Sequence, residues 1–276
     1  MKNSAVFIVA IMFSTLVSAA GVEQYTVFEL ELKGPSTGNP FTDVHISAEF
    51  SHLNRTMFCE GFYDGNGIYR IRFMPDEPGK WTYITKSNIK ELDLKKGSFT
   101  CVAAAAGNHG PVKVRNTFDF GYADGTPFYP VGTTCYAWVH QPEELVKETL
   151  ATLKKTAFNK IRMTVMPKNY DVYINNEPPF YPFEKSSQGK WDFFRPDPAF
   201  FRNFEQKILE LQKLGIEADI ILFHPYDRGK WNFDKMNSEE AVFYLRYLIA
   251  RIAAYRNVWW SLANEYDLMP NKTMAD

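Results

Sequence analysis

The hydrophobic pattern of the chain changes its period once, and this change constrains the fold more than any other feature. Over residues 25–104 apolar and polar residues alternate, as Val44, Ile46, Ala48 and Phe50 show. Strict alternation is typical of strands that bury one face. The first part of the chain is therefore predicted to be all β.

Turn residues separate these strands. Residues 64–67 (DGNG) lie between the runs 55–64 and 67–73, which we expect to form a hairpin. Several short strands at this spacing, with no helical period among them, predict an all-β sandwich over residues 21–104. The small residues that follow predict a linker over residues 105–116.

After the linker, over residues 117–276, apolar strands alternate with amphipathic helices. Asp197 precedes a Pro and is the predicted N-cap of the second helix. The predicted strands cover residues 128–134, 160–166, 218–223 and 258–263, and the predicted helices cover 142–158, 198 to about 215, and a segment that begins at 237 or 238.

Three βα units and a fourth strand predict four parallel strands and three helices, the first half of a (β/α)8 TIM barrel. An open, doubly wound sheet is the alternative. It is disfavoured because no Gly-rich phosphate loop follows the first strand, where residues 133–136 (TTCY) stand instead.

The N-terminus predicts export. Lys2, an apolar run over residues 5–17 and the small residues after it are typical of a signal peptide over residues 1–20, cut after Ala19 or Ala20. We therefore expect a secreted or periplasmic protein. No later run reaches about 18 apolar residues, so no membrane span is expected.

The composition indicates few classes of partner. A net charge of −1 and a pI near 6.5 give no reason to expect nucleic acid or an anionic membrane, and the sequence carries no signal for an oligomeric state. Cys59, Cys101 and Cys135 are odd in number, so at least one thiol stays unpaired. Cys59 and Cys101 either pair within the sandwich or remain buried thiols. No metal-ligand spacing is present among Cys and His, and no cofactor is expected.

The candidate site lies beyond the carboxyl ends of the predicted parallel strands, where barrels place their functional groups. Ser261, Ala263 and Glu265 share one parity, so small residues would fill the interior while Trp260 and Leu262 face the helices. Asn264 needs a bulge or the strand end to point the same way as Glu265. The polar and aromatic residues at these ends are Tyr136, Trp138 and His140; Arg162, Lys168 and Tyr170; His224, Tyr226 and Asp227; and Asn264 and Glu265.

Several motifs carry a resemblance to known hydrolases. Residues 158–162 (FNKIR), 221–224 (ILFH) and 264–265 (NE) are similar to the retaining clan of (β/α)8 glycosidases that includes cellulases and β-mannanases. A closer resemblance is to secreted bacterial apiosidase-like or cellulase-like barrels with an N-terminal β-sandwich. It rests on residues 132–138 (GTTCYAW), 224–228 (HPYDR), 259–267 (WWSLANEYD) and, in the sandwich, 72–76 (RFMPD) with Gly79 and Trp81.

The resemblance implies a carbohydrate substrate and double displacement by two carboxylates. By motif, Glu265 is the acid/base, Asn264 binds the sugar 2-hydroxyl, Arg162 orients the nucleophile and His224 lines the subsite. A general acid must hold its proton, so Glu265 is expected to be buried among aromatic side chains. The nucleophile of this clan comes from a seventh strand, which the sequence does not contain, so the chain as given is expected not to turn over substrate. A plant polysaccharide or its side chains is the expected substrate class. The predicted substrate-binding residues are His224, Tyr226, Asp227, Trp138, Tyr136, Lys168 and Tyr170.

Other interpretations stay open. Arg162 also suits an ion pair with Glu265, and His224 suits a hydrogen-bonded structural role. A non-catalytic carbohydrate-binding protein and an inactive truncated fragment are alternative functions, and an oxidoreductase on an open sheet is disfavoured by the missing loop. The aromatic residues that equally suit packing of the loops are Trp138, Tyr170, Trp191, Tyr226 and Trp231.

Overall fold

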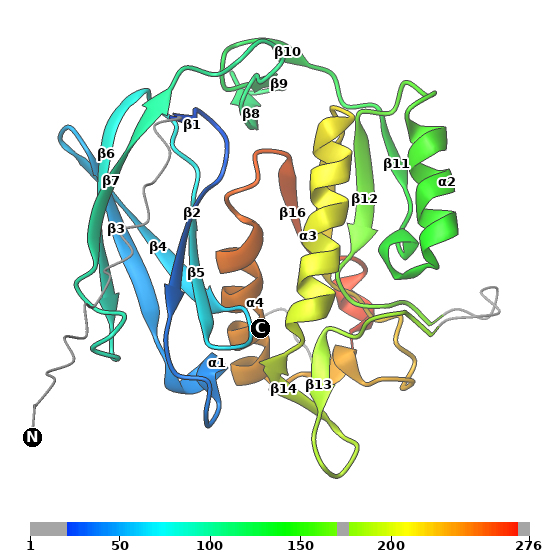
Figure 1. Cartoon of the computed structure of the whole chain (residues 1–276). Coiled ribbons are helices and arrows are strands. Elements are labelled where there is room, and N and C mark those ends of the chain that lie inside the picture. Colours follow the sequence, from blue (N-terminus) through cyan, green and yellow to red (C-terminus); the bar gives the residue numbers. More distant parts are fainter. Residues whose placement is uncertain (1–20, 170–176, 270–276) are drawn as a thin grey trace, which may run out of the picture.

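The computed structural model describes residues 21–169 and 177–269. Figure 1 shows a β-rich part built from the first strands and an α/β part built from the later elements, with helix α4 (Ser238–Ile252) on the side that faces the β-rich part. The predicted signal peptide and Tyr170 lie outside the described residues.

The β-rich part is one mixed sheet of seven strands in the order β1-β7-β6-β3-β4-β5-β2. β1 runs parallel to β7, and all other neighbours are antiparallel. A short helix, α1 (Pro40–Asp43), precedes β3. The strands are β1 (Val22–Glu23), β2 (Phe28–Lys33), β3 (Ile46–His52), β4 (Arg55–Tyr63), β5 (Ile68–Phe73), β6 (Gly79–Ser87) and β7 (Lys96–Val102).

This sheet folds over itself at β4, so the predicted sandwich is one continuous sheet with two packed layers. The first six residues of β4 pair with β3 and its last three pair with β5. The change occurs at Gly61, where an added Cβ would lie 2.7 Å from a backbone oxygen of β5. Aromatic rings fill the space between the layers: Phe50 stacks on Phe73 at 4.3 Å, and Phe28 stacks on Phe99 at 4.0 Å. The predicted hairpin is confirmed as β4 and β5.

All three cysteines are free thiols, so of the two alternatives for Cys59 and Cys101 the structure has the unpaired one. Cys59 lies on β4 and Cys101 on β7, with β3 and β6 between them. Three interstrand spacings amount to about 14 Å, about twice the Cα separation that a disulfide can bridge. Burial raises the pKa of the Cys59 thiol to about 11, which keeps it protonated.

A small three-stranded sheet joins the two parts at one end of the molecule (Figure 1). It consists of β8 (Val112–Arg115), β9 (Asp119–Tyr122) and β10 (Pro127–Phe128). The predicted linker over residues 105–116 therefore contains a strand, and the predicted strand over 128–134 is divided between two sheets.

The α/β part contains a four-stranded sheet in the order β11-β12-β15-β16, and every neighbouring pair is parallel. The prediction of four parallel strands in sequence order is confirmed. The strands are β11 (Gly132–Thr134), β12 (Lys160–Thr164), β15 (Glu217–Phe223) and β16 (Val258–Ala263), and the helices between them are α2 (Glu143–Leu153), α3 (Pro198–Lys213) and α4.

Local capping sets where two of these helices begin. The Asp197 carboxylate accepts a hydrogen bond from the Ala199 N–H at 2.8 Å, which confirms the predicted N-cap of α3. Asn237 and Glu240 form a reciprocal capping box at the start of α4. A feature that the sequence pattern missed is the hairpin of β13 (Phe183–Lys185) and β14 (Trp191–Pro196), which stands where a loop was expected.

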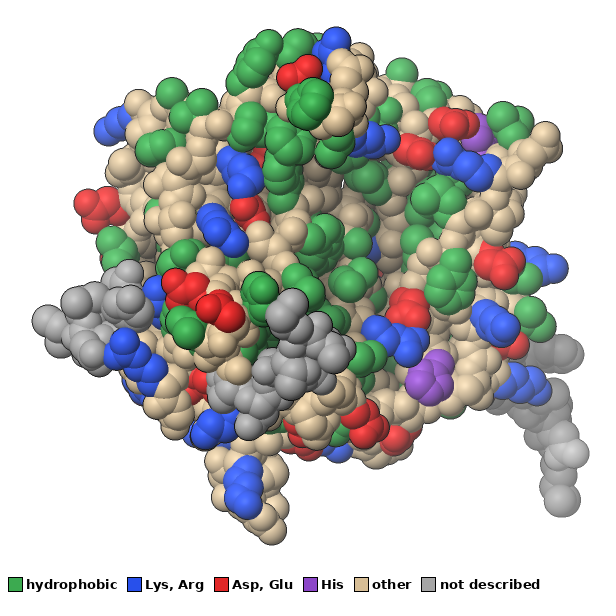
Figure 2. All heavy atoms as spheres, turned by 180° about the vertical axis from the view of Figure 1, so that it is seen from behind, with side chains coloured by type: hydrophobic (Ala, Val, Ile, Leu, Met, Phe, Trp, Pro, Cys, Tyr) green, Lys and Arg blue, Asp and Glu red, His purple; other side chains and the backbone are tan. Residues whose placement is uncertain are grey.

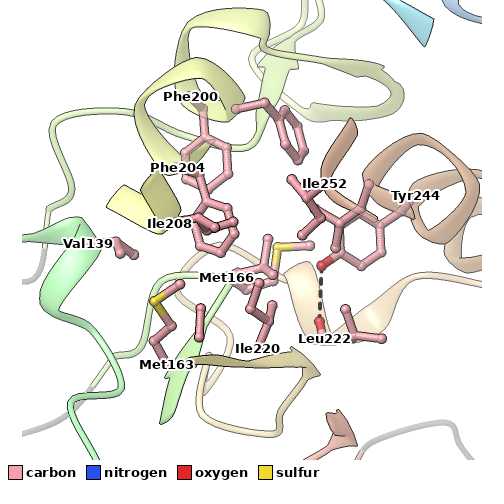
Figure 3. Packing of buried hydrophobic residues seen from close by; sticks show 14 of the residues in the cluster. Val139, Met163, Met166, Phe200, Phe204, Ile208, Ile220, Leu222, Tyr244 and Ile252 are labelled. Carbon is pink, nitrogen blue, oxygen red and sulfur yellow. Dashed lines mark hydrogen bonds between the residues drawn. The ribbon is translucent and has the colours of Figure 1, made fainter. Parts of the chain in front are cut away.

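The three helices pack on one face of the parallel sheet. Met163 of β12 and Ile220 of β15 are buried there against Phe204 and Ile208 of α3, as Figure 3 shows. In the same view the Tyr244 hydroxyl donates to the Leu222 carbonyl at 3.1 Å, so this buried phenol is satisfied. The helix side of the sheet is therefore the hydrophobic core of the α/β part.

The opposite face of the sheet is polar. Asp219 of β15 accepts a hydrogen bond from Ser261 of β16 at 2.7 Å and forms an ion pair with Lys160 of β12. Trp259 donates to Glu217 at 3.0 Å on the same face. Ser261 therefore lies on the polar face, opposite the helices.

Strand β16 lies at the edge of the sheet. Trp260 and Leu262 are 43% and 67% exposed, although both were expected to pack against helices. They are exposed because, among the described residues, no element covers β16 on its outer side.

A buried ionic network joins the two parts of the fold. Arg251 of α4 is fully buried and pairs with Glu205 of α3 and with Asp64, which follows β4. Arg72 of β5 donates to Glu205 at 3.1 Å and to the Arg251 carbonyl at 2.6 Å. On the surface, by contrast, basic and acidic side chains are interspersed over the face that Figure 2 shows.

Candidate active site

The carboxyl ends of the four parallel strands bring five of the predicted residues together. Tyr136 follows β11, Lys168 follows β12, Tyr226 follows β15, and Asn264 and Glu265 follow β16. Parallel strands present their carboxyl ends at one edge, which explains why residues so distant in sequence meet. We call these five residues the edge cluster.

Hydrogen bonds link Tyr136, Asn264 and Tyr226 within the edge cluster. The Tyr136 hydroxyl donates to Asn264 Oδ1 at 3.5 Å, and Asn264 Nδ2 donates to the Tyr226 hydroxyl. The Glu265 carboxylate is the next group along, close enough to the Tyr226 hydroxyl to affect its pKa. Burial raises the pKa of Tyr226, and the neighbouring Glu265 carboxylate raises it further, so the phenol stays protonated.

The Lys168 ammonium contacts the two tyrosine rings of the edge cluster. Its Nζ lies 4.3 Å from the ring centre of Tyr136 and 4.2 Å from that of Tyr226, close enough for cation–π attraction to both rings. Lys168 is 7% exposed. Burial lowers the pKa of Lys168, the Glu265 carboxylate opposes that effect, and Arg228 adds to it.

Asn264 and Glu265 both come close to Tyr226, and β16 ends directly before them. The strand ends at Ala263, and the Asn264 N–H still bonds to the Phe223 carbonyl at 3.0 Å. Glu265 then adopts a left-handed conformation with φ 50° and ψ 51°. Such a conformation costs a non-Gly residue roughly 1 kcal/mol and is found disproportionately at functional sites.

Glu265 is exposed, which differs from the expected burial among aromatic side chains. The Glu265 carboxylate affects the pKa of the Tyr226 hydroxyl, yet the Glu265 side chain stays open to solvent. The exposure follows from the position of Glu265 beyond an edge strand.

Arg162 lies on the polar face of the sheet, one layer below the edge cluster. Its Nε is 4.0 Å from Asp219 Oδ2, so its nearest carboxylate in the described residues is Asp219 rather than Glu265. Within these residues Arg162 Nε is buried without a hydrogen-bond partner. The suggested ion pair with Glu265 is not formed.

His224 is buried and hydrogen-bonded through both ring nitrogens, which fits the structural role left open for it. Its Nε2 bonds to the Met166 carbonyl at 3.0 Å, and its Nδ1 accepts from the Tyr226 N–H at 3.1 Å. Burial lowers the pKa of His224 to about 4, although the hydrogen bond to the Met166 carbonyl opposes this shift, so the ring is neutral at ordinary pH. The His224 ring stacks on Tyr226 at 5.1 Å and supports it from behind.

Asp227 and Trp138, also predicted to bind substrate, are buried. Asp227 is 1% exposed, and its two oxygens accept from the Trp231 and Phe233 N–H groups, each at 2.7 Å. Trp138 is 5% exposed in the core, where its indole N–H contacts Met163 Sδ at 3.1 Å. Both residues hold the scaffold, and Tyr170 lies outside the described residues.

Two acidic residues of β15 were missed by the sequence analysis. On the polar face, Asp219 pairs with Lys160, accepts a hydrogen bond from Ser261 and lies near Arg162. Glu217 is 4% exposed, and burial raises its pKa to about 7, although the hydrogen bond from Trp259 opposes this shift. The available signal was that acidic residues occupy alternate positions at the start of an otherwise apolar strand.

No group of three or more His, Cys, Asp or Glu in residues 21–169 and 177–269 is placed to hold a metal ion. In the same residues no helix is long and apolar enough to cross a membrane. The edge cluster itself can supply hydrogen bonding by Asn264 and the two tyrosines and proton transfer by Glu265.

The fold and the site define an α/β protein with a parallel sheet whose carboxyl edge carries an acid, an amide and two phenols. The chain belongs to the apiosidase-like family: the family's catalytic domain matches residues 115–276, more than half of the chain. A domain of unknown function (DUF5060) matches residues 21–88, within the β-rich part. A comparison with curated proteins finds no match.

The chain is also similar to solved structures. A proposed glycoside hydrolase from Bacteroides vulgatus ATCC 8482 is 49% identical, with a TM-score of 0.88 over 91% of this chain and 51% of that one. The chain thus spans about half the length of that relative. The endo-1,4-β-mannanase of Rhizomucor miehei is 16% identical, with a TM-score of 0.41 over 56% of this chain and 48% of that one. The latter likeness is too weak to define the fold.

Proposed function

We propose that the protein is a glycoside hydrolase that acts on poly- or oligosaccharides by retaining double displacement, with Glu265 as the acid/base. One observation carries the proposal: Glu265 directly follows Asn264 at the carboxyl end of β16 in a parallel sheet, and Asn264 is hydrogen-bonded to Tyr226 there. A carboxylic acid is the group that protonates the glycosidic oxygen in such enzymes, and an adjacent amide can hydrogen-bond a sugar hydroxyl. Membership of the apiosidase-like family supports it.

We further propose that the α/β part, residues 117–276, is half of a (β/α)8 barrel, preceded by a linker over 105–116 and a β domain over 21–104. Two features support a barrel over a doubly wound sheet. The strands follow one another in chain order, whereas a doubly wound sheet reverses its order at a switch point. The helices also pack on one face only, and the other face is polar as described above.

Each member of the site has a proposed role. Asn264 binds the sugar 2-hydroxyl, and Tyr136, Lys168 and Tyr226 form the wall of the subsite. Arg162 orients the nucleophile, because its buried Nε has a free donor within the described residues. The nucleophile itself is expected on a seventh strand, outside this sequence.

The place of action and the substrate class are also proposals. Residues 1–20 are proposed to be a signal peptide, so the protein would act outside the cytoplasm, secreted or in the periplasm. A plant polysaccharide or its side chains is the proposed substrate class.

Leaving-group dependence in the whole protein tests the role of Glu265. Glu265→Gln should lose activity on aryl glycosides with poor leaving groups, by about a hundredfold or more, and keep the first chemical step on highly activated ones. Asp267→Asn is the matched control, because Asp267 is an exposed carboxylate two residues away. Equal rates for wild type and Glu265→Gln on every substrate that is cleaved would refute the assignment.

A second candidate is a non-catalytic carbohydrate-binding protein. The exposure of Glu265 favours it, because an exposed carboxylate suits hydrogen bonding to sugar hydroxyls better than proton donation. The two functions differ in one measurement: a binder would retain oligosaccharide affinity in calorimetry while the whole protein hydrolyses none of the aryl glycosides.

A further inference from the structure

Lys168 has a geometry that a simple sugar contact does not explain. Its ammonium lies at nearly equal distances from two aromatic rings, those of Tyr136 and Tyr226, whose centres are 6.1 Å apart. The two rings come from loops after different strands, β11 and β15, so this one charge links them.

The two tyrosines that share Lys168 are also the two that hold Asn264. Tyr136 donates to the amide oxygen of Asn264, and Tyr226 accepts from its amide nitrogen. An Asn amide held at both ends has one orientation, whereas an Asn held at one end can rotate about its last bond. The orientation of Asn264 therefore depends on where the two phenols are placed.

We propose that Lys168 is a positioning residue that fixes Tyr136 and Tyr226 by cation–π contact and thereby sets the orientation of Asn264. The role is indirect, because Lys168 acts through the rings. The inference rests on the proposed function only in that Asn264 is taken to be a group that binds sugar. The contacts do not depend on it.

The surroundings of Lys168 include further charges. Glu265 raises and Arg228 lowers the pKa of its ammonium, and the neutral ring of His224 stands behind Tyr226. Because burial lowers the pKa of Lys168, the ammonium can be neutralised at a pH below the ordinary range of a lysine. Tyr226 titrates higher than an ordinary tyrosine, so its hydrogen bonds persist meanwhile.

Nuclear magnetic resonance of this chain tests the inference without any catalytic assay. The readout is the side-chain amide of Asn264, assigned with Asn264→Asp. In Lys168→Met, which keeps the length of the side chain and removes the charge, this amide should exchange with water about tenfold faster or more, while Lys168→Arg should stay near wild type. Lys185→Met is the matched control, because Lys185 also lies over an aromatic ring, that of Trp191 at 4.5 Å, but outside the edge cluster.

If Lys168→Met fails to fold, a pH titration of the wild-type chain tests the same inference. The Asn264 amide shifts should follow the same midpoint as the Lys168 Cε resonance. Unchanged exchange in a folded Lys168→Met, or an Asn264 shift that does not follow the Lys168 midpoint, would overturn the inference. Absence of hydrolysis by the whole protein and all its variants would instead overturn the proposed function and leave the resonance result to decide the role of Lys168.

Discussion

Loss of the Arg251 guanidinium should destabilise the whole fold. Arg251 of α4 is fully buried and bonds to Asp64 Oδ1 and to the Tyr247 hydroxyl, at 2.9 and 3.0 Å, and to Glu205. Removing one partner of a buried ion pair typically costs about 3–5 kcal/mol, because the other charge stays buried without compensation. In Arg251→Met, Glu205 still has Arg72, so we expect the lower end, about 3 kcal/mol.

Urea unfolding and thermal unfolding of the chain measure this effect. About 3 kcal/mol corresponds to a fall of about 6–12 °C in Tm for a chain of this size. Arg246→Met is the matched control. Arg246 lies on the same helix and also bonds to the β-rich part, through Glu60, but its side chain is 63% exposed. An exposed pair contributes at most about 1 kcal/mol.

A double-mutant cycle isolates the pair. Glu205→Gln alone should also destabilise, and the double variant Arg251→Met with Glu205→Gln should lose at least about 1 kcal/mol less than the sum of the single variants. The reasoning would be refuted if Arg251→Met cost no more than Arg246→Met. It would equally be refuted by additive single effects, because then Arg251 and Glu205 would not be coupled.

Three further predictions concern single side chains. Burial raises the pKa of Glu217 to about 7, so the folded chain holds a proton that the unfolded chain releases near 4.5, and stability is lost as pH rises from about 4.5 through 7. In urea unfolding, Glu217→Gln should therefore stabilise the chain at pH 8, by up to about 3 kcal/mol, but not at pH 4. Asp227→Asn should cost about 1–3 kcal/mol in the same assay, because an amide accepts from only one of the two N–H groups at 2.7 Å, and oligosaccharide affinity measured by calorimetry should not change. Asn237→Ala removes the capping box of α4 and should lower the free energy of unfolding by about 1 kcal/mol, with no such loss in the control Ser238→Ala.

Features set by neighbouring residues were predictable from the sequence. The bounds of β16 match the predicted strand, and α3 begins directly after its predicted N-cap, Asp197, because the apolar period and the cap act within a few residues. The sheet β8–β10 and the hairpin β13–β14 were missed. Short strands carry little periodicity, and their pairing depends on partners that the local pattern does not specify.

The site shows the same limit at the level of side chains. Strand ends placed Tyr226 and Asp227 correctly at the carboxyl edge, but the direction of each side chain depends on the loop that follows. The loop after β15 turns back so that the Trp231 and Phe233 N–H groups meet Asp227, which draws its carboxylate inward. A position at the end of a strand therefore predicts that a residue lies at the carboxyl edge of the sheet, but the direction of its side chain is set by tertiary contacts.

The exposure of Glu265 and the exposure of Trp260 and Leu262 have one structural origin. All three belong to β16 or follow it directly, and β16 is the edge of the parallel sheet. An element that pairs with β16 would cover Trp260 and Leu262 and would also enclose Glu265 from the side that is now open. Burial of the acid and closure of the sheet are then one event, because the same neighbour provides both. If Glu265 acts as a general acid, its competence should therefore depend on what pairs with β16.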